Sequence, residues 1–130
     1  SAASDVYKRQ IIHYTQLHMN LVLGFLYGLM AQILTFVQLQ GQFKYVWMKD
    51  NPLLVALIGI PLSLLYINAV SYMVKHFNGE MWPSRILGFS IGVIVFTIMS
   101  WLWFKEPLTL KTLVCLGLAC CILAIQLLWK

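Results

Sequence analysis

The chain has 130 residues, of which 61% are hydrophobic and only 10% are charged, and its mean hydropathy is +0.81. Soluble domains are about half apolar and about one quarter charged, so this composition excludes a soluble globular protein and indicates an integral membrane protein. The net charge is +5, but Lys and Arg lie mainly in short segments between apolar runs. No basic helix with interleaved aromatic residues is present, so we expect no nucleic acid partner.

The chain begins with a segment, residues 1–18, that does not read as a membrane span. It precedes Met19, a natural start, and it lacks the apolar core of a signal peptide. We interpret residues 1–18 as a non-native or disordered arm. The alternative is an amphipathic arm that lies on the membrane surface. Residues 19–130 are then the single predicted domain.

Four apolar runs of about 20 residues follow, the length that crosses a hydrocarbon core of about 30 Å. They cover approximately residues 20–40, 52–73, 85–103 and 110–129. The connectors between them are short and carry charged and aromatic residues, as segments at a membrane surface do. Because short connectors place consecutive helices antiparallel, the sequence predicts an all-α, up-down-up-down four-helix bundle in a membrane.

The first span carries a stripe of small and polar residues. At 100° per residue, one arc of about 120° contains Gly24, Gly28, Ala31, Gln32, Thr35, Gln38 and Gln42. Polar side chains that face lipid are unfavourable, so this stripe should face protein or a water-filled cavity. Two interpretations stay open. Gly24, Gly28 and the hydrogen-bonding side chains can serve helix packing, or Gln32 can line a cavity for a solute.

The second span has Pro61 near its middle, where proline frees a backbone carbonyl and permits a kink. Tyr66 and Asn68 follow toward its end. Both can contact a solute, although an asparagine in a span also serves as a hydrogen-bonding residue between helices.

The third span contains Gly88 and Gly92, which permit close packing or local bending. It begins at Arg85, for which there are two interpretations. The side chain can extend to the lipid headgroups, or it can line a cavity mouth together with Trp82 and favour an anion.

The reactive side chains form no recognisable catalytic or metal-binding pattern. Cys115, Cys120 and Cys121 lie in the fourth span, where a thiol behaves as a small hydrophobic group, and the three histidines are widely separated. The sequence contains no Ser-His-acid arrangement, no Gly-rich phosphate loop and no pair of carboxylates within a span. We therefore expect a protein that is not an enzyme and that binds no metal or cofactor.

Basic residues are nearly balanced between the two ends of the predicted bundle. One end would carry Lys8, Arg9, Lys75, Arg85 and Lys130. The other would carry Lys44, Lys49, Lys105 and Lys111. Because an excess of Lys and Arg orients a membrane protein, this balance has two interpretations. Either the chain inserts both ways and pairs with an opposed copy, or the structure or a partner fixes one orientation.

The segment "IGVIVFTIMSWLWFKEPLTLKTLVCLGLACCILAIQLL" has the most distinctive pattern. A Gly-rich third span ends in Ser-Trp, the short turn "KEPLTL" follows, and a fourth span rich in small residues closes the chain. With these features, Met19 to Lys130 resembles the small four-helix members of the drug/metabolite transporter superfamily, including the small multidrug resistance proteins. The resemblance implies a dual-topology homodimer, with a substrate chamber formed by the first three helices, in the inner membrane of a prokaryote. The fourth helix would make the dimer contact, through Gly117, Cys121 and Ala124.

The multidrug members carry an essential glutamate in the first helix, within a Leu-Ala-Glu context, which binds a cation and a proton in turn. The matching "LMAQ" places Gln32 at that position, and glutamine cannot ionise. We therefore predict transport of a small neutral or anionic solute by alternating access. The predicted solute contacts are Gln32, Tyr66, Asn68, Trp82 and Arg85. The alternative is a non-transporting structural or accessory membrane protein whose polar residues serve only helix packing.

Overall fold

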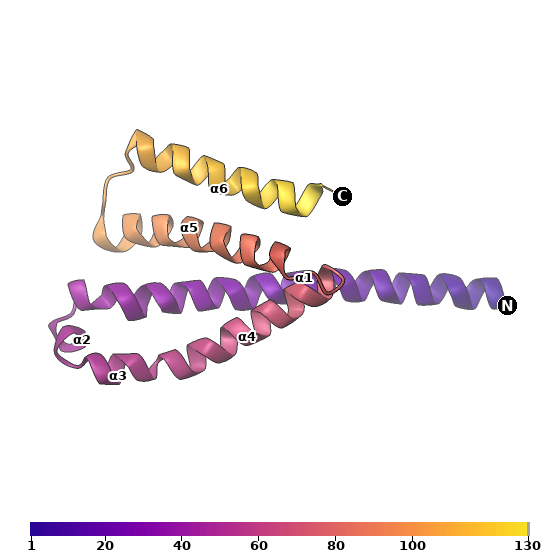
Figure 1. Ribbon diagram of the computed structural model, residues 1–130, viewed down its shortest axis with the longest axis horizontal. Helices are drawn as coiled ribbons and strands as arrows, with labels where there is room; N and C mark the ends of the chain where they lie inside the picture. The colour runs from indigo at the N-terminus through magenta and orange to yellow at the C-terminus, as the bar shows by residue number, and fades with distance from the viewer. Residues whose placement is uncertain (130) are drawn as a thin grey trace.

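The computed structural model describes residues 1–129, and the regular elements of this part of the chain are all helices (Figure 1). In chain order they are α1 (Ala2–Gln40), η1 (Gly41–Phe43), α2 (Val46–Asp50), α3 (Pro52–Leu57), α4 (Gly59–His76), α5 (Trp82–Phe104) and α6 (Leu110–Leu128). Four segments are long and apolar enough to cross a membrane: Ala2–Phe43, Pro52–His76, Trp82–Phe104 and Leu110–Leu128. The fold is therefore an all-α membrane bundle of four spans, as the sequence predicted.

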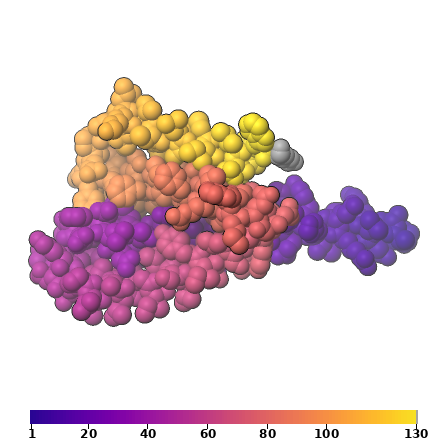
Figure 2. Space-filling model, viewed as in Figure 1, coloured from indigo at the N-terminus to yellow at the C-terminus, as the bar shows by residue number. Residues whose placement is uncertain are grey.

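Consecutive spans run in opposite directions, so the topology is up-down-up-down (Figure 1). The most extensive contacts join α1 to α4 and α5 to α6, and α1 also contacts α5. Figure 2 shows α6 as the outermost helix, with the face turned away from α5 uncovered. Of the residues of α6, Ala119 alone is buried. The helix α6 therefore packs mainly against α5, at the side of the bundle, and most of its surface is left uncovered.

The first helix is much longer than a single membrane span. It has 39 residues, which corresponds to about 58 Å, or about twice the thickness of a hydrocarbon core. Residues 1–16 are exposed, and the N-terminal part of α1 projects beyond the other helices (Figure 1). Residues 2–18, which belong to the predicted arm, continue into the first span as one helix, and no Gly or Pro occurs in it before Gly24. Contact with the bundle begins at Leu17, whose carbonyl oxygen lies 2.8 Å from Nδ1 of His76.

Two glycines of α1 allow α4 to approach closely. Gly24 and Gly28 are both buried. A Cβ atom at Gly24 would lie 2.7 Å from Cγ of Met73 and 3.3 Å from its backbone nitrogen. At Gly28 the nearest atom would be Cε of Met73, at 3.6 Å. Gly24 therefore sets the spacing between α1 and α4. Met73 belongs to the buried core, with Leu87, Ile91 and Val95.

The second span is broken into two helices at Ile58. Pro61 has no N–H group, and its ring crowds the carbonyl four residues earlier, that of Leu57, where α3 ends. The amide nitrogen of Ile58 donates to the carbonyl oxygen of Val55 at 3.1 Å. Nε2 of Gln38 on α1 donates to the same oxygen at 3.2 Å. A polar side chain of the α1 stripe therefore stabilises the break, and this use of Gln38 is structural.

Left-handed residues reverse the chain after α4 and after α5. Asn78 and Gly79 have φ angles of 57° and 90°, and Lys105 has a φ of 54°. These turns place the α4–α5 connection and the C-terminal end of α6 at one end of the bundle, and the α5–α6 connection at the other, near α2 (Figure 1). Lys130, which the sequence assigned to the first of these ends, lies outside the described residues.

Candidate functional site

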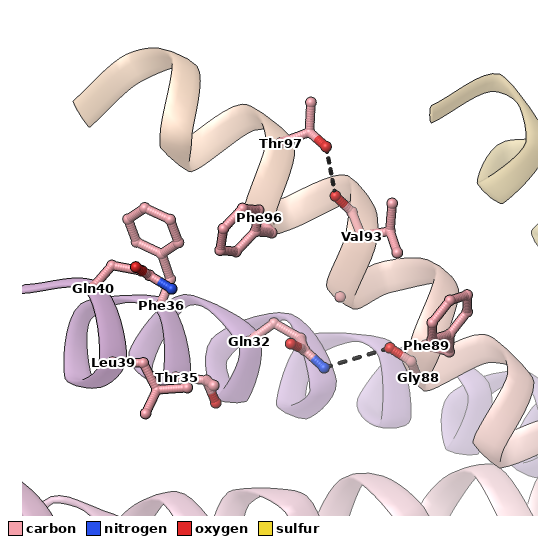
Figure 3. Close-up of a pocket in the computed structure, with 11 residues that line it drawn as sticks. Gln32, Thr35, Phe36, Leu39, Gln40, Gly88, Phe89, Val93, Phe96 and Thr97 are labelled. Atoms are coloured by element: carbon pink, nitrogen blue, oxygen red, sulfur yellow. Dashed lines mark hydrogen bonds between the residues drawn. The ribbon is translucent and has the colours of Figure 1, made fainter. Parts of the chain in front are cut away.

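Gln32 lies where α1 faces both α4 and α5. Its Nε2 donates to the carbonyl oxygen of Gly88 on α5 at 3.4 Å, a long hydrogen bond (Figure 3). That carbonyl lies inside a helix, where it accepts from the amide four residues later, so the bond from Gln32 is a weak second one. Within residues 1–129, Oγ of Ser90 is the only fully buried side-chain polar atom without a partner. Oε1 of Gln32 accepts no hydrogen bond within these residues and is not among the fully buried atoms, so it must reach the accessible surface.

A cavity of about 420 Å³ opens between α1 and α5 beside Gln32 (Figure 3). Aromatic side chains from both helices line it: Phe36 from α1, and Phe89 and Phe96 from α5. The rings of Phe36 and Phe96 meet edge to face with centroids 5.4 Å apart. The walls of this cavity are therefore mainly apolar, and the amide of Gln32 is a polar group at one end.

A second cavity, of about 510 Å³, shares three lining residues with the first, namely Gln32, Gly88 and Phe89. A Cβ atom at Gly88 would meet no atom within 4 Å, so the backbone of α5 leaves open space at this junction. The other residues that line the second cavity include Tyr66, Ser84 and Arg85. The two cavities adjoin at these shared residues along α5, and we call them together the Gln32 groove.

The hydroxyl group of Tyr66 is held next to the groove by Thr35. Their oxygen atoms are 2.7 Å apart, and the hydroxyl of Thr35 also donates to the carbonyl oxygen of Ala31 at 2.7 Å. Since the Thr35 hydroxyl has a single proton, which it gives to Ala31, Tyr66 must donate to Thr35. The oxygen of Tyr66 then keeps its capacity as an acceptor. Gln32 and Tyr66 therefore both offer acceptor oxygens near the centre of the groove.

Three of the five predicted solute contacts come together in the groove: Gln32, Tyr66 and Arg85. Asn68 is exposed on α4, and Trp82, which is 78% exposed, lies on the first turn of α5. Neither of these two residues lines the groove.

The small residues predicted to serve packing have different surroundings. Gly24 and Gly28 contact α4, and Gly92 lies against the amide of Gln32, whereas Gly88 faces the open groove. On α6, the predicted dimer residues Gly117, Cys121 and Ala124 are all exposed. Their strip is therefore free on the surface of a single chain.

The structure adds residues that the sequence did not single out as site residues. Ser84 is buried and lines the second cavity, and Phe36 and Phe89 line the first. For Ser84 the one local signal was its position after Pro83 at the start of a span, and that position does not determine whether the side chain lines a cavity. No comparable signal existed for Phe36 and Phe89, since aromatic residues in a span can equally face lipid.

In comparisons with protein-family models, curated proteins and solved structures, nothing matches this chain. The resemblance to small members of the drug/metabolite transporter superfamily therefore stays a prediction from the sequence. Among the described residues, no group of three or more His, Cys, Asp or Glu side chains could hold a metal ion. The groove contains hydrogen-bonding side chains, aromatic rings and one guanidinium group, an arrangement suited to binding a molecule.

Alanine substitutions at Gly88 and Gly92 should have different effects on stability. A Cβ at Gly92 would lie 3.1 Å from Oε1 and 3.2 Å from Nε2 of Gln32, whereas a Cβ at Gly88 would meet open space. Gly88→Ala should raise the free energy of unfolding by up to about 1 kcal/mol through helix propensity. Gly92→Ala should gain less or lose stability, because the amide of Gln32 must move. Thermal unfolding of both variants in detergent measures the difference, and equal stabilisation would contradict the placement of Gln32.

Proposed function

We propose that the protein is a small membrane transporter that moves a small neutral or anionic solute through the Gln32 groove by alternating access. The position of Gln32 is the observation that carries this proposal. Its side chain lies within a membrane span and lines both cavities, and its Oε1 accepts no hydrogen bond from the described residues. Polar groups inside a membrane mark solute pathways, and transporter sites lie between helices near the bilayer midplane.

The charge of the groove favours a neutral or anionic solute. Among the described residues that line it, Arg85 is the only charged one. A cation would find no carboxylate partner in this groove, and it would be repelled by the guanidinium group. Exchange of a proton for a cationic drug, as in the multidrug members, requires an ionisable group at position 32, where this chain has glutamine.

We further propose that the protein works as a homodimer of opposed copies, in the inner membrane of a prokaryote. The exposed strip of Gly117, Cys121 and Ala124 on α6 would permit close approach of a second chain. The nearly balanced basic residues at the two ends of the bundle would permit both orientations.

A second candidate function is that of a structural or accessory membrane protein. It is favoured by the hydrogen bonds that join α1 to its neighbours, namely Gln32 to Gly88 at 3.4 Å and the Thr35–Tyr66 contact at 2.7 Å. In this function the polar side chains contribute only to stability, and the groove holds lipid.

Uptake into vesicles tests the proposal. Purified protein is reconstituted into liposomes, and the uptake of a panel of labelled small neutral, anionic and cationic solutes is compared with uptake by protein-free vesicles. We expect faster uptake of a neutral or anionic solute and no change for the cations. Rates equal to those of protein-free vesicles for the whole panel would favour the accessory function, and uptake of cations alone would contradict the proposed selectivity.

Fusions at the C-terminus should be active with both alkaline phosphatase and green fluorescent protein. Alkaline phosphatase reports a C-terminus outside the cytoplasm, and green fluorescent protein reports one inside it. Both signals therefore arise only if both orientations occur. Activity of one fusion alone would remove the dual-topology proposal and leave the bundle unaffected.

Oxidative crosslinking tests the dimer contact, with two of the three cysteines as matched controls. Three variants that keep only Cys115, only Cys120 or only Cys121 are compared, since all three thiols are exposed in the single chain. We expect the strongest disulfide-linked dimer from Cys121, which lies in the small-residue strip. Equal crosslinking of all three would indicate random collisions.

A further inference from the structure

The first turn of α5 has the properties of an anion site. This helix has 23 residues, and its first turn contains no acidic residue. Pro83 has no N–H group, and the amide of Arg85 donates to the carbonyl oxygen of Met81 at 3.2 Å. The free N–H groups of this turn are therefore those of Trp82 and Ser84, and the helix dipole adds a partial positive charge there. Arg85 lies on this turn and lines the second cavity of the Gln32 groove. A guanidinium group can hold a carboxylate or a phosphate through two parallel hydrogen bonds.

Ser84 provides an independent observation at the same place. It is only 5% exposed, and it lines both the second cavity and a smaller one of about 40 Å³ next to Gln32. Within the described residues, the side-chain hydrogen bonds that reach α5 involve Gly88, Val93, Thr97 and Trp103. Oγ of Ser84 therefore has no partner. Because Oγ of Ser90 is the only fully buried unpaired side-chain polar atom in residues 1–129, Oγ of Ser84 must be accessible, and its residue borders the cavity that Arg85 also lines.

The rest of the groove is suited to an apolar body. Along α5, Arg85 and Phe96 are separated by about 16 Å, at 1.5 Å per residue. Between them the groove passes the open space at Gly88 and reaches the cavity lined by Phe36 and Phe89. An inorganic anion would occupy only the Arg85 end and leave the aromatic cavity empty.

We propose that the Gln32 groove binds an amphipathic anion, with its charged head at Ser84 and Arg85 and its apolar body extending along α5 toward Phe96. The head is a carboxylate, sulfate or phosphate group. This inference rests on the proposed function and narrows its solute class. The same chemistry is found in water-soluble amphiphiles and in anionic membrane lipids, and the experiment below distinguishes these two sources.

Octyl phosphate is a suitable probe, because it joins a phosphate group to a short alkyl chain. The full chain is placed in nanodiscs of phosphatidylcholine and dialysed against radiolabelled octyl phosphate, with empty nanodiscs as the blank. We expect saturable binding above the blank, with little competition from inorganic phosphate or from octyltrimethylammonium. Binding no greater than the blank would overturn the inference, as would equal competition by the cationic amphiphile.

Variants at the head site test its assignment. Arg85→Gln should weaken binding by about tenfold or more, and Ser84→Ala by about threefold or more, because each removes a donor to a charged group. Lys75→Gln is the matched control, since it removes one positive charge at the same end of the bundle from a side chain that lies over the ring of Tyr72. Its effect should stay below about twofold. An equal loss in Lys75→Gln and Arg85→Gln would show nonspecific attraction and overturn the site.

Gly88→Leu tests the path of the apolar body. Because a Cβ at Gly88 meets no atom within 4 Å, the larger side chain should fill the groove without disturbing the fold. We expect this variant to lose octyl phosphate binding although Ser84 and Arg85 are unchanged. Undiminished binding by folded Gly88→Leu protein would show that the anion stays at the surface and would overturn the proposed path.

Phosphatidylglycerol in the nanodiscs identifies the source. Competition with octyl phosphate would assign the groove to an anionic lipid, and the absence of competition would assign it to a soluble amphiphile; both results support the shared chemistry.

Uptake into vesicles separates this inference from the proposed function. Octyl phosphate binding without any uptake would contradict the transporter alone, whereas uptake of neutral solutes by protein that binds no octyl phosphate would overturn the inference alone.

Discussion

Gln32→Leu should abolish solute uptake and leave the protein folded. The substitution removes the acceptor oxygen at the junction of the two cavities, so uptake should fall by about tenfold or more if that oxygen binds the solute. The lost hydrogen bond to Gly88 is 3.4 Å long, and its loss should lower the free energy of unfolding by about 1 kcal/mol or less. Uptake and thermal unfolding are measured on the same preparation.

The opposite pattern would identify Gln32 as a packing residue. In that case Gln32→Leu would lower stability and the uptake per folded molecule would not change. Gln42→Leu is the matched control, because Gln42 lies farther along the chain, is exposed, and bonds to the carbonyl oxygen of Leu39 at 3.0 Å. This control should alter neither property.

Gln32→Glu adds a gain of function to the same test. A carboxyl group at this position should give the groove pH-dependent binding of a lipophilic cation such as tetraphenylphosphonium, because only the ionised form attracts it. Burial disfavours the charged form and should raise the pKa of this new carboxyl group above its usual range. Binding should therefore rise between about pH 5 and about pH 9, and wild-type protein should bind little throughout. Gln42→Glu is the matched control and should bind no cation. Failure of Gln32→Glu to bind the cation at any pH would leave the groove without support as a chamber.

Gly24→Ala should lower the stability of the bundle more than the same substitution at Gly28. Its Cβ would lie 2.7 Å from Cγ and 3.3 Å from the backbone nitrogen of Met73, so α1 and α4 would have to separate. Overpacking of this kind costs about 1–3 kcal/mol. The free energy of unfolding in detergent, measured by circular dichroism, is the appropriate quantity.

Gly28→Ala is the control on the same face of α1. There the new Cβ would meet Cε of Met73 at 3.6 Å, an ordinary contact with the end of a flexible side chain. We expect a change of less than about 1 kcal/mol. A loss at Gly28 as large as that at Gly24 would show that the helices approach differently.

The number of spans could be predicted because it depends on apolar run length, and their directions because short connectors place consecutive helices antiparallel. The second run was expected over 52–73, and the structure has Pro52–Leu57 and Gly59–His76 on either side of Ile58. The run length does not reveal this break, which depends on the ring of Pro61 and on the hydrogen bond from Gln38. The short helices η1 and α2 were missed because they are too short to show a periodic pattern.

The candidate site was predicted only in part, for geometric reasons. Tyr66 and Asn68 are two residues apart on one helix, which separates their directions by about 200°, so they cannot both face the groove. Tyr66 faces it, and Asn68 is exposed. The lining by Ser84 and Phe89 depends on how α5 crosses α1 and α4, a long-range property that the local pattern does not contain.

Water access at position 32 distinguishes a transport chamber from a packing contact most directly. In a background with Cys115, Cys120 and Cys121 replaced by alanine, Gln32→Cys is treated with a membrane-impermeant thiol reagent from each side of the membrane. Met30→Cys, at nearly the same depth on an exposed face of α1, is the lipid-facing control. If the protein is a transporter, we expect the thiol of Gln32→Cys to react with the reagent and that of Met30→Cys not to react. A Gln32→Cys thiol as unreactive as the control, in folded protein, would contradict a water-filled Gln32 groove.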